Sequence, residues 1–214
     1  MINFKEQKES LMKYWVDNGI ITNQDVLRAF RKVKRENFMT DEHRNYSYSD
    51  NAFPTIKGQT ISQPTTVMMM TQDLNPIKGN KILEIGTGSG YQAAILAEII
   101  NPGIVYTTEI VPELYELAKK NLKNYKNVRI FLSDGSLGLK KYALFDRIIV
   151  TAACSETPMS LFRQLRINGI LLAPIGDLYS QVIYKFTRLK DNIEEKVLGD
   201  FKFVPLKGKY GFDG

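Results

Sequence analysis

Residues Lys81–Ala97 read KILEIGTGSGYQAAILA. The short apolar run 82–85 predicts a buried parallel strand. From 92 to 99 the apolar side chains recur at the spacing of one helix face, which predicts a helix. The glycines at 86, 88 and 90 predict a tight turn between them, because glycine allows unusual backbone angles and close approach to a ligand. A strand, a glycine turn and a helix in this order favour a nucleotide-like ligand at the carboxyl end of the first strand.

The spacing of the three glycines restricts which ligand this turn can hold. A dinucleotide fingerprint needs glycine at the first, third and sixth positions, and here the sixth position is Tyr91. A lysine followed by Ser or Thr, as in a triphosphate loop, is also absent from the turn. A glycine turn that follows Glu84 and lacks phosphate-binding features fits S-adenosylmethionine, which carries a sulfonium, an amino-acid end, a ribose and an adenine. On this stretch alone, a turn that binds no ligand remains an alternative.

Two further predicted strands end in acidic residues. The run 104–108 ends in Glu109, about twenty residues after the turn, where doubly wound folds place an acid that binds the ribose. A carboxylate has two oxygens and can accept from both ribose hydroxyls. The run 128–132 ends in Ser133-Asp134-Gly135, and an acid there is predicted to reach the adenine amino group. Each acid alone fits a solvated loop end, but three in this order favour a cofactor site.

Length and composition describe an ordinary globular chain. The 214 residues predict one domain, in which 1–75 supply N-terminal helices and a substrate-cleft segment and 76–214 supply the cofactor-binding sheet and C-terminal strands. The single cysteine, Cys154, excludes an internal disulfide and fits a reducing compartment. The first residues lack the apolar core of a signal peptide, and no apolar run reaches membrane-spanning length. A cytoplasmic monomer with no membrane partner is therefore expected.

The chain is basic, with a formal net charge of +6. Lysines and arginines gather at 28–35 and at 119–126, and such runs either face nucleic acid or acidic substrates or form solvated helix faces. No helix-turn-helix, zinc-ligand or base-stacking pattern accompanies them, so no nucleic-acid partner is expected. The only histidine, His43, has no second histidine or cysteine nearby, and no metal site is predicted.

The remaining pattern predicts an α/β protein with a doubly wound, mostly parallel, seven-stranded sheet and an N-terminal helical extension. Asn23 is a predicted N-cap, and Pro64 is predicted to open a helix that runs to Leu74. Further helices are expected at about 5–17, 23–34 and 158–165. Later strands are expected at 145–151, 170–173, 182–189 and 201–204, the last of them antiparallel.

Several blocks of the sequence together resemble one known family. They read QTISQP at 59–64, LEIGTGSGYQAA at 83–94, FDRIIVTAA at 145–153 and FVPL at 203–206, with Gln164-Leu165 and Pro174-Ile175-Gly176 between the last two. These blocks are similar to those of the protein-L-isoaspartate O-methyltransferases. The glycine block is shared by many methyltransferases, whereas the QTIS and FVPL blocks are the specific ones.

The resemblance implies a Rossmann-like class I methyltransferase. Its reaction would move a methyl group from S-adenosylmethionine to the α-carboxylate of L-isoaspartyl residues in damaged proteins and peptides, leaving S-adenosyl-L-homocysteine. The ester would then close to a succinimide that hydrolyses partly to normal aspartate. The sequence departs from the family pattern at Ser133 and Asn168, where glycine is usual or common, and Lys57 occupies a variable position.

The resemblance also implies roles for individual residues. Ser62 would orient the acceptor carboxylate, with Thr60 beside it. The cofactor would contact Glu84, Gly86, Thr87, Gly88, Ser89, Glu109, Asp134, Gly135 and Thr151. The substrate would contact Gln59, Ile61, Ala152, Val204, Pro205 and Leu206. Two alternatives stay open: Ser62 as a helix cap ahead of Pro64, and 204–206 as a terminal core strand.

The reaction requires little chemical catalysis from these residues. A carboxyl group with an ordinary pKa near 4 is already an anion at neutral pH, so no general base is needed. Holding this anion against a sulfonium, away from water, supplies acceleration through proximity. Two other functions remain possible from the sequence: methylation of RNA or a small molecule, and a cofactor-sensing module without catalysis. The amino-methylating signature of Asn or Asp, two prolines and an aromatic is absent, and an intact Ser62 argues against a sensor.

Overall fold

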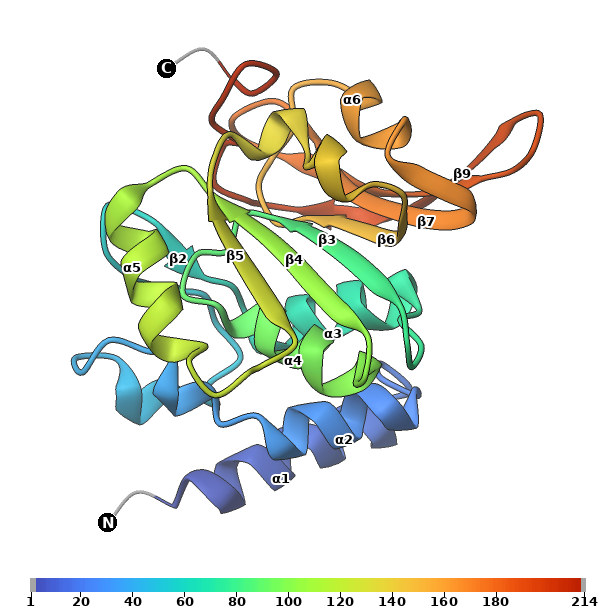
Figure 1. Ribbon diagram of the computed structural model, residues 1–214. Helices are drawn as coiled ribbons and strands as arrows, with labels where there is room; N and C mark the ends of the chain where they lie inside the picture. The colour runs from blue at the N-terminus through green and yellow to red at the C-terminus, as the bar shows by residue number, and fades with distance from the viewer. Residues whose placement is uncertain (1–2, 213–214) are drawn as a thin grey trace.

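The computed structural model describes residues 3–212. Within them, one seven-stranded sheet has the order β5-β4-β3-β6-β7-β8-β9 (Figure 1). Its strands are β3 (Lys81–Ile85), β4 (Ile104–Glu109), β5 (Val128–Leu132), β6 (Phe145–Val150), β7 (Leu165–Gly176), β8 (Gln181–Arg188) and β9 (Ile193–Phe201). Neighbours from β5 to β7 pair in parallel, and β8 and β9 pair antiparallel. The predicted fold class is confirmed.

Both faces of the central strand β3 are buried, as its apolar run predicts. Successive side chains of a strand point to opposite faces. Ile82 joins the apolar cluster under the long helices, whereas Leu83 and Ile85 join the cluster on the other face. The first face is covered by α3 (Pro64–Leu74), α4 (Tyr91–Ile100) and α5 (Pro112–Asn121), and α6 (Met159–Phe162) lies on the second face (Figure 1).

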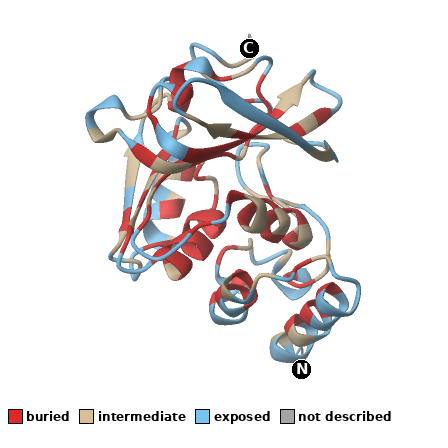
Figure 2. Cartoon of the chain, turned by 90° about the vertical axis from the view of Figure 1, so that its right-hand side faces the viewer, coloured by how far each residue is buried: buried red, intermediate tan, exposed pale blue. Residues whose placement is uncertain are grey.

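An outer layer of helices covers α3 and α4. It consists of α1 (Phe4–Asp17) and α2 (Gln24–Lys32), whose buried sides turn inward (Figure 2). Trp15 and Phe30 pack edge to face with ring centroids 4.6 Å apart, and both are fully buried. The Asn23 side chain accepts from Asp25 N at 2.9 Å and Val26 N at 3.2 Å, so the predicted N-cap is confirmed.

The expected helix at 158–165 is present but shorter than predicted. Only Met159–Phe162 is α-helical, and β7 already begins at Leu165. Leu165 is fully buried and pairs with Phe145 of β6. Pairing with β6 from Leu165 onward therefore limits the helix to the first part of the expected range.

The final strand also differs from expectation. It runs over Ile193–Phe201 rather than 201–204 and pairs antiparallel with β8. Its polar residues suit an exposed edge strand, where charged side chains prevent pairing with other chains. The segment 203–206 lies beside the end of β6 instead: Ala153 N donates to Val204 O, and Leu206 N donates to Ala153 O, both at 2.8 Å.

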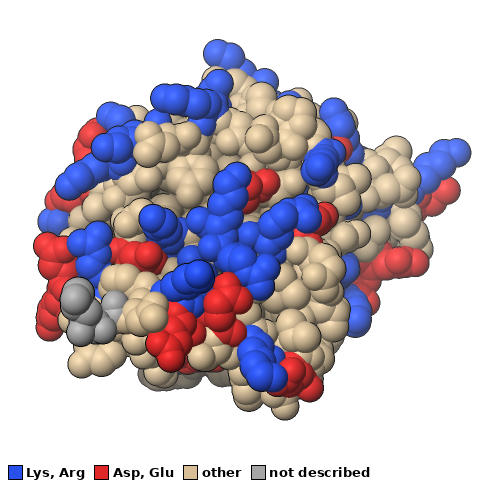
Figure 3. Space-filling model, turned by 90° about the horizontal axis from the view of Figure 1, so that it is seen from below, with Lys and Arg blue, Asp and Glu red and all other residues tan. Residues whose placement is uncertain are grey.

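The two basic runs lie partly in ion pairs. Arg31 pairs with Glu9, Lys32 with Glu98, and Lys119 with Glu116. Figure 3 shows a group of basic side chains near the middle of one face, with acidic side chains beside it. Across residues 3–212 no helix has the length and apolarity to span a bilayer, and no cluster of three His, Cys, Asp or Glu residues could hold a metal ion.

Candidate active site

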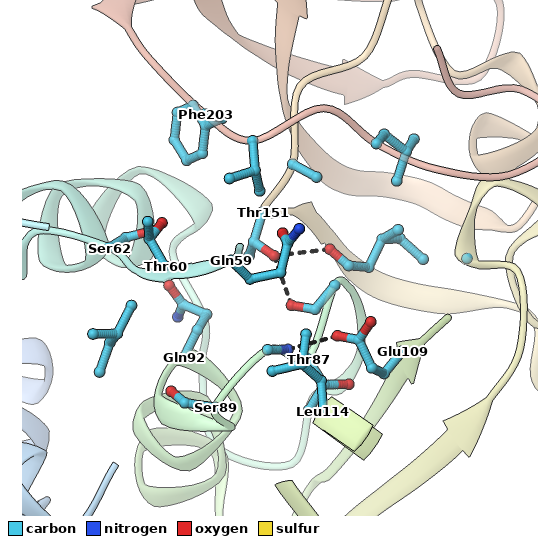
Figure 4. A pocket seen from close by; sticks show the side chains of 18 of the residues that line it. Gln59, Thr60, Ser62, Thr87, Ser89, Gln92, Glu109, Leu114, Thr151 and Phe203 are labelled. Carbon is cyan, nitrogen blue, oxygen red and sulfur yellow. Dashed lines mark hydrogen bonds between the residues drawn. The ribbon is translucent and has the colours of Figure 1, made fainter. Parts of the chain in front are cut away.

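A pocket opens at the carboxyl ends of β3, β4 and β6, where parallel sheets of this class bind ligands (Figure 4). Its free space is about 980 Å³ including the open mouth. Ser62 and Thr60 lie at one side and Glu109 at the other. Most of the predicted site residues line it: Gln59, Thr60, Ile61, Ser62, Gly86, Thr87, Gly88, Ser89, Glu109, Gly135, Thr151, Ala152, Val204, Pro205 and Leu206.

The glycine turn forms the floor of the pocket. Gly86 has φ +94°, and a Cβ there would lie 2.7 Å from Thr151 Oγ1, so a larger residue would collide. The Thr151 hydroxyl donates to Ile85 O at 2.9 Å and to Gly86 O at 2.7 Å. The N–H groups of Gly86 and Thr87 both donate to Thr108 O at 3.0 Å. The turn is thus fastened to the ends of β4 and β6 before any ligand binds.

Glu109 is the last residue of β4, and its carboxylate faces the turn. Oε2 accepts from Gly88 N at 2.8 Å, and Oε1 accepts from Ile110 N at 2.9 Å and Val111 N at 3.0 Å. An ionised carboxylate offers about four acceptor positions. One position on Oε2 therefore remains for a further donor without displacing a main-chain bond.

Glu84 does not line the pocket. It is fully buried behind the turn, where Thr107 Oγ1 donates to its Oε2 at 2.5 Å and the hydroxyls of Thr87 and Thr107 lie 2.7 Å apart. Its other oxygen has no hydrogen-bond partner among the described residues. Burial raises the pKa of Glu84 from 4.5 to about 8, against the opposing effect of the Thr107 hydroxyl. A neutral Glu84 thus supports the turn from inside the sheet.

This buried carboxyl predicts a pH-dependent stability. Between about pH 4.5 and 8 the unfolded chain releases a proton that folded Glu84 keeps, so the free energy of unfolding falls as pH rises, by up to about 1.4 kcal/mol per unit. Glu84→Gln retains the acceptor for Thr107 and removes the titration. We expect chemical denaturation at pH 5 and pH 8 to show a smaller difference for this variant than for the parent. Glu116→Gln, on the surface of α5, is the control, and a Glu84→Gln slope equal to the control's contradicts the assignment.

Asp134 also points away from the pocket. Its Oδ1 accepts from Ser136 N at 2.8 Å and Ser136 Oγ at 2.7 Å, and its Oδ2 accepts from Lys209 N at 2.8 Å. The carboxylate therefore holds the C-terminal segment against the loop after β5. Gly135, the next residue, does line the pocket.

Ser62 lies in the corner between β2 (Thr60–Ile61) and α3. Strand β2 pairs with β1 (Phe53–Pro54) in a short hairpin. The N-cap of α3 is Gln63, so Ser62 is not the helix cap that the sequence left open. Within residues 3–212 its hydroxyl has no hydrogen-bond partner, although it lines the pocket. A hydroxyl in this position is free to donate to a bound group.

An ion pair joins the β1–β2 turn to α5. Lys57, in the β1–β2 turn, contacts Glu113, in the first turn of α5, at 2.5 Å. The hydrogen bond from Lys57 lowers the pKa of Glu113.

Several residues that line the pocket were not predicted from the sequence. Gln92, Leu114 and Phe203 also form part of the pocket wall (Figure 4). Ile110 and Val111 line it too, directly after Glu109. An apolar pair directly after a predicted ribose-binding acid is a sequence signal that can identify these two residues as part of the pocket. Nothing comparable marks Leu114, because α5 is brought to the pocket only by tertiary packing.

The family model described as protein-L-isoaspartate(D-aspartate) O-methyltransferase matches residues 6–211. The chain belongs to this family. A protein-L-isoaspartate O-methyltransferase of Dictyoglomus thermophilum is 45% identical over 98% of this chain and 94% of its own length. One of Staphylothermus marinus is 42% identical over 98% of this chain and 97% of its own length.

Solved structures agree with this family membership. A protein-L-isoaspartate O-methyltransferase of Plasmodium falciparum, in complex with S-adenosyl-L-homocysteine, superposes with a TM-score of 0.83 at 29% identity and covers 94% of this chain and 98% of its own. As a protein-L-isoaspartate O-methyltransferase, the chain is an S-adenosylmethionine-dependent enzyme of protein repair whose substrates are isoaspartyl-containing proteins. The predictions of family, cofactor and reaction are confirmed.

Proposed function

We propose that this one pocket holds both reactants, with the cofactor over the glycine turn and the acceptor α-carboxylate at Ser62. The observation that carries the proposal is that an unpaired Ser62 hydroxyl and the Glu109 carboxylate line the same pocket from opposite sides. When bound, S-adenosylmethionine supplies a methyl group on a positively charged sulfur. The residues of this chain bind the two reactants, orient them and shield them from water.

On the cofactor side, Glu109 is proposed to accept a ribose hydroxyl at the free position on Oε2. The main chain of Gly86 and Gly88 would approach the methionine half, since both glycines line the pocket. Glu84 and Asp134 act indirectly in this proposal. Glu84 supports the turn through Thr107, and Asp134 holds the loop that presents Gly135 at the adenine end.

On the acceptor side, Ser62 donates to the substrate α-carboxylate and fixes its direction. Gln59, Thr60 and Ile61 would form one edge of the peptide cleft and 204–206 the other, because both segments line the pocket. The carboxylate is ionised at neutral pH, so no proton has to be removed. Correct placement of the reacting atoms is then the main contribution of the protein.

Replacing Glu109 tests the cofactor placement. Glu109→Ala removes the acceptor for a ribose hydroxyl and the anchor for Gly88 N, so we expect cofactor binding to weaken by about 1.5–3 kcal/mol, the scale of hydrogen bonds to charged groups. Calorimetry with S-adenosyl-L-homocysteine measures this directly. Glu116→Ala, whose side chain pairs with Lys119 on the outer face of α5, serves as the control. An unchanged affinity for Glu109→Ala would place the ribose elsewhere.

We infer that the chain acts as one catalytic unit, as a monomer in the cytoplasm. Support comes from the walls of the pocket, which residues of both 1–75 and 76–214 form. Neither part contains the whole site. Sedimentation of the purified chain at assay concentration is expected to show a species of 24.4 kDa, the mass of one chain, and a stable dimer would contradict this inference.

A further inference from the structure

We propose that Asp50 is a positioning residue for methyl transfer, acting through the corner of the chain that carries Ser62. Its Oδ1 accepts from Thr65 N at 2.9 Å. Its Oδ2 accepts from Thr65 Oγ1 at 2.6 Å and from Gln63 Nε2 at 3.0 Å. One carboxylate thus holds three donors from the residues that directly follow Ser62. The inference rests on the role proposed for Ser62.

The start of α3 needs such a partner from outside the helix. The first N–H groups of a helix have no partner within it, and a side chain usually supplies the cap. Gln63, at the N-cap, makes no capping bond with its own side chain, and Pro64 has no N–H. Asp50 fills this place for Thr65 N from a separate segment, and its charge is favourable at a helix N-terminus. The direction in which the chain leaves Ser62 is therefore set by Asp50.

The hydrogen bonds of Asp50 connect the Ser62 corner to the outer helical layer. Trp15 Nε1 donates to Thr65 Oγ1 at 2.7 Å, and Trp15 is completely buried in α1. The Thr65 hydroxyl thus bridges the indole and the Asp50 carboxylate. This ties the corner to a rigid part of the core that lies outside the pocket.

A buried guanidinium interacts electrostatically with the same carboxylate. Arg35 is completely buried, and its three guanidinium nitrogens have no hydrogen-bond partner among the described residues. Burial lowers the pKa of Arg35 to about 10, and Tyr91, Tyr48 and Asp50 favour its charged form. Asp50, which is half-buried, is one of the groups that favour this charge. It does not line the pocket, which is why we assign it to positioning rather than to contact with the reactants.

Asp50→Asn keeps the shape of the side chain but removes its charge and turns one oxygen into a donor. That donor would face either Thr65 N or Gln63 Nε2, so at least one of the three bonds is lost. A misplacement of about 1 Å can cost about a hundredfold in rate. We expect a partial misplacement, with kcat on an isoaspartyl peptide lowered about tenfold or more and the affinity for S-adenosyl-L-homocysteine changed less than about twofold.

Asn23→Ala is a matched control for stability. Asn23 caps α2 through Asp25 N and Val26 N, which is the same kind of bond in the same helical layer, but it lies outside the pocket lining. Both variants are expected to lower the unfolding midpoint, and only Asp50→Asn is expected to lower kcat. The fluorescence of Trp15, the only tryptophan, should shift in Asp50→Asn and not in the control, because its hydrogen-bond partner moves.

The double variant Asp50→Asn/Ser62→Ala decides whether Asp50 acts through Ser62. We expect it to be no slower than Ser62→Ala alone. Rate losses that multiply, or an Asp50→Asn rate no lower than that of Asn23→Ala, overturn the inference and leave the role of Ser62 standing. A fully active Ser62→Ala overturns both. If Asp50→Asn does not fold, Thr65→Val removes one of the three donors and should lower kcat in the same direction by a smaller factor.

Discussion

A peptide that contains L-isoaspartate is expected to be methylated at least about a hundred times faster than the same peptide with aspartate. The isoaspartyl linkage adds a methylene to the main chain and leaves the α-carboxylate as a short branch. In normal aspartate the carboxylate projects from a different atom, so a peptide held along 59–61 and 204–206 would place it away from the Ser62 hydroxyl. Recognition of an extended peptide through its main chain also predicts broad tolerance of the flanking side chains.

Initial rates of methyl transfer to paired peptides measure this selectivity. The ionised acceptor is the reactive form, so the rate should fall as pH drops through the pKa of the acceptor carboxyl, near 4. The selectivity between the two peptides should persist at each pH, because both acceptors are carboxylates. Equal labelling of the two peptides, or preferential labelling of RNA under the same conditions, would contradict the proposed acceptor site.

Ser62→Ala is expected to lower kcat on the isoaspartyl peptide by about a hundredfold. The hydroxyl has no partner within residues 3–212, so its loss breaks no internal hydrogen bond and stability should change little. Binding of S-adenosyl-L-homocysteine should also stay near that of the parent, because the glycine turn and Glu109 are untouched. Single-turnover rates, calorimetry and thermal unfolding of one preparation give the three quantities.

Ser180→Ala is the matched control for this variant. Ser180 is exposed in the β7–β8 turn and lies outside the pocket lining, so the same truncation there should leave rate, affinity and stability unchanged. A Ser62→Ala variant that lost affinity or stability in proportion to its rate would have a structural role instead. The separation of rate from affinity is therefore the decisive result.

Local signals explain why much of the fold was predictable. Pro64 fixes its own φ and lacks an N–H, and the structure places it at the start of α3, which ends at Leu74 as expected. Apolar runs between turn residues marked β3 to β6, since buried parallel strands need no polar face. Glycines at 86, 88 and 90 all have positive φ, so the turn follows from the residues themselves.

The acids at the strand ends show where local reasoning stops. Glu109 ends β4, and its side chain can turn into the pocket. Glu84 lies one residue earlier in its strand, in register with Thr107 on one side and Ile149 on the other, so its side chain is confined to a face of the sheet. Asp134 follows its strand by two residues, and the main-chain N–H of Lys209, from a distant segment, donates to it. Acidic residues at or near the ends of neighbouring strands thus have different partners, depending on their position in the strand.

The sequence by itself determined the family, the cofactor, the reaction and most of the residues that line the pocket, because these depend on short blocks whose glycines, prolines and apolar runs act locally. Only the tertiary structure showed that the last strand of the sheet is Ile193–Phe201, with 203–206 beside the end of β6. It alone showed that Leu114 closes the wall of the pocket and that Asp50 caps the helix after Ser62. Those features join segments distant in the chain. Their energies depend on burial and pairing across the fold, which no local pattern records.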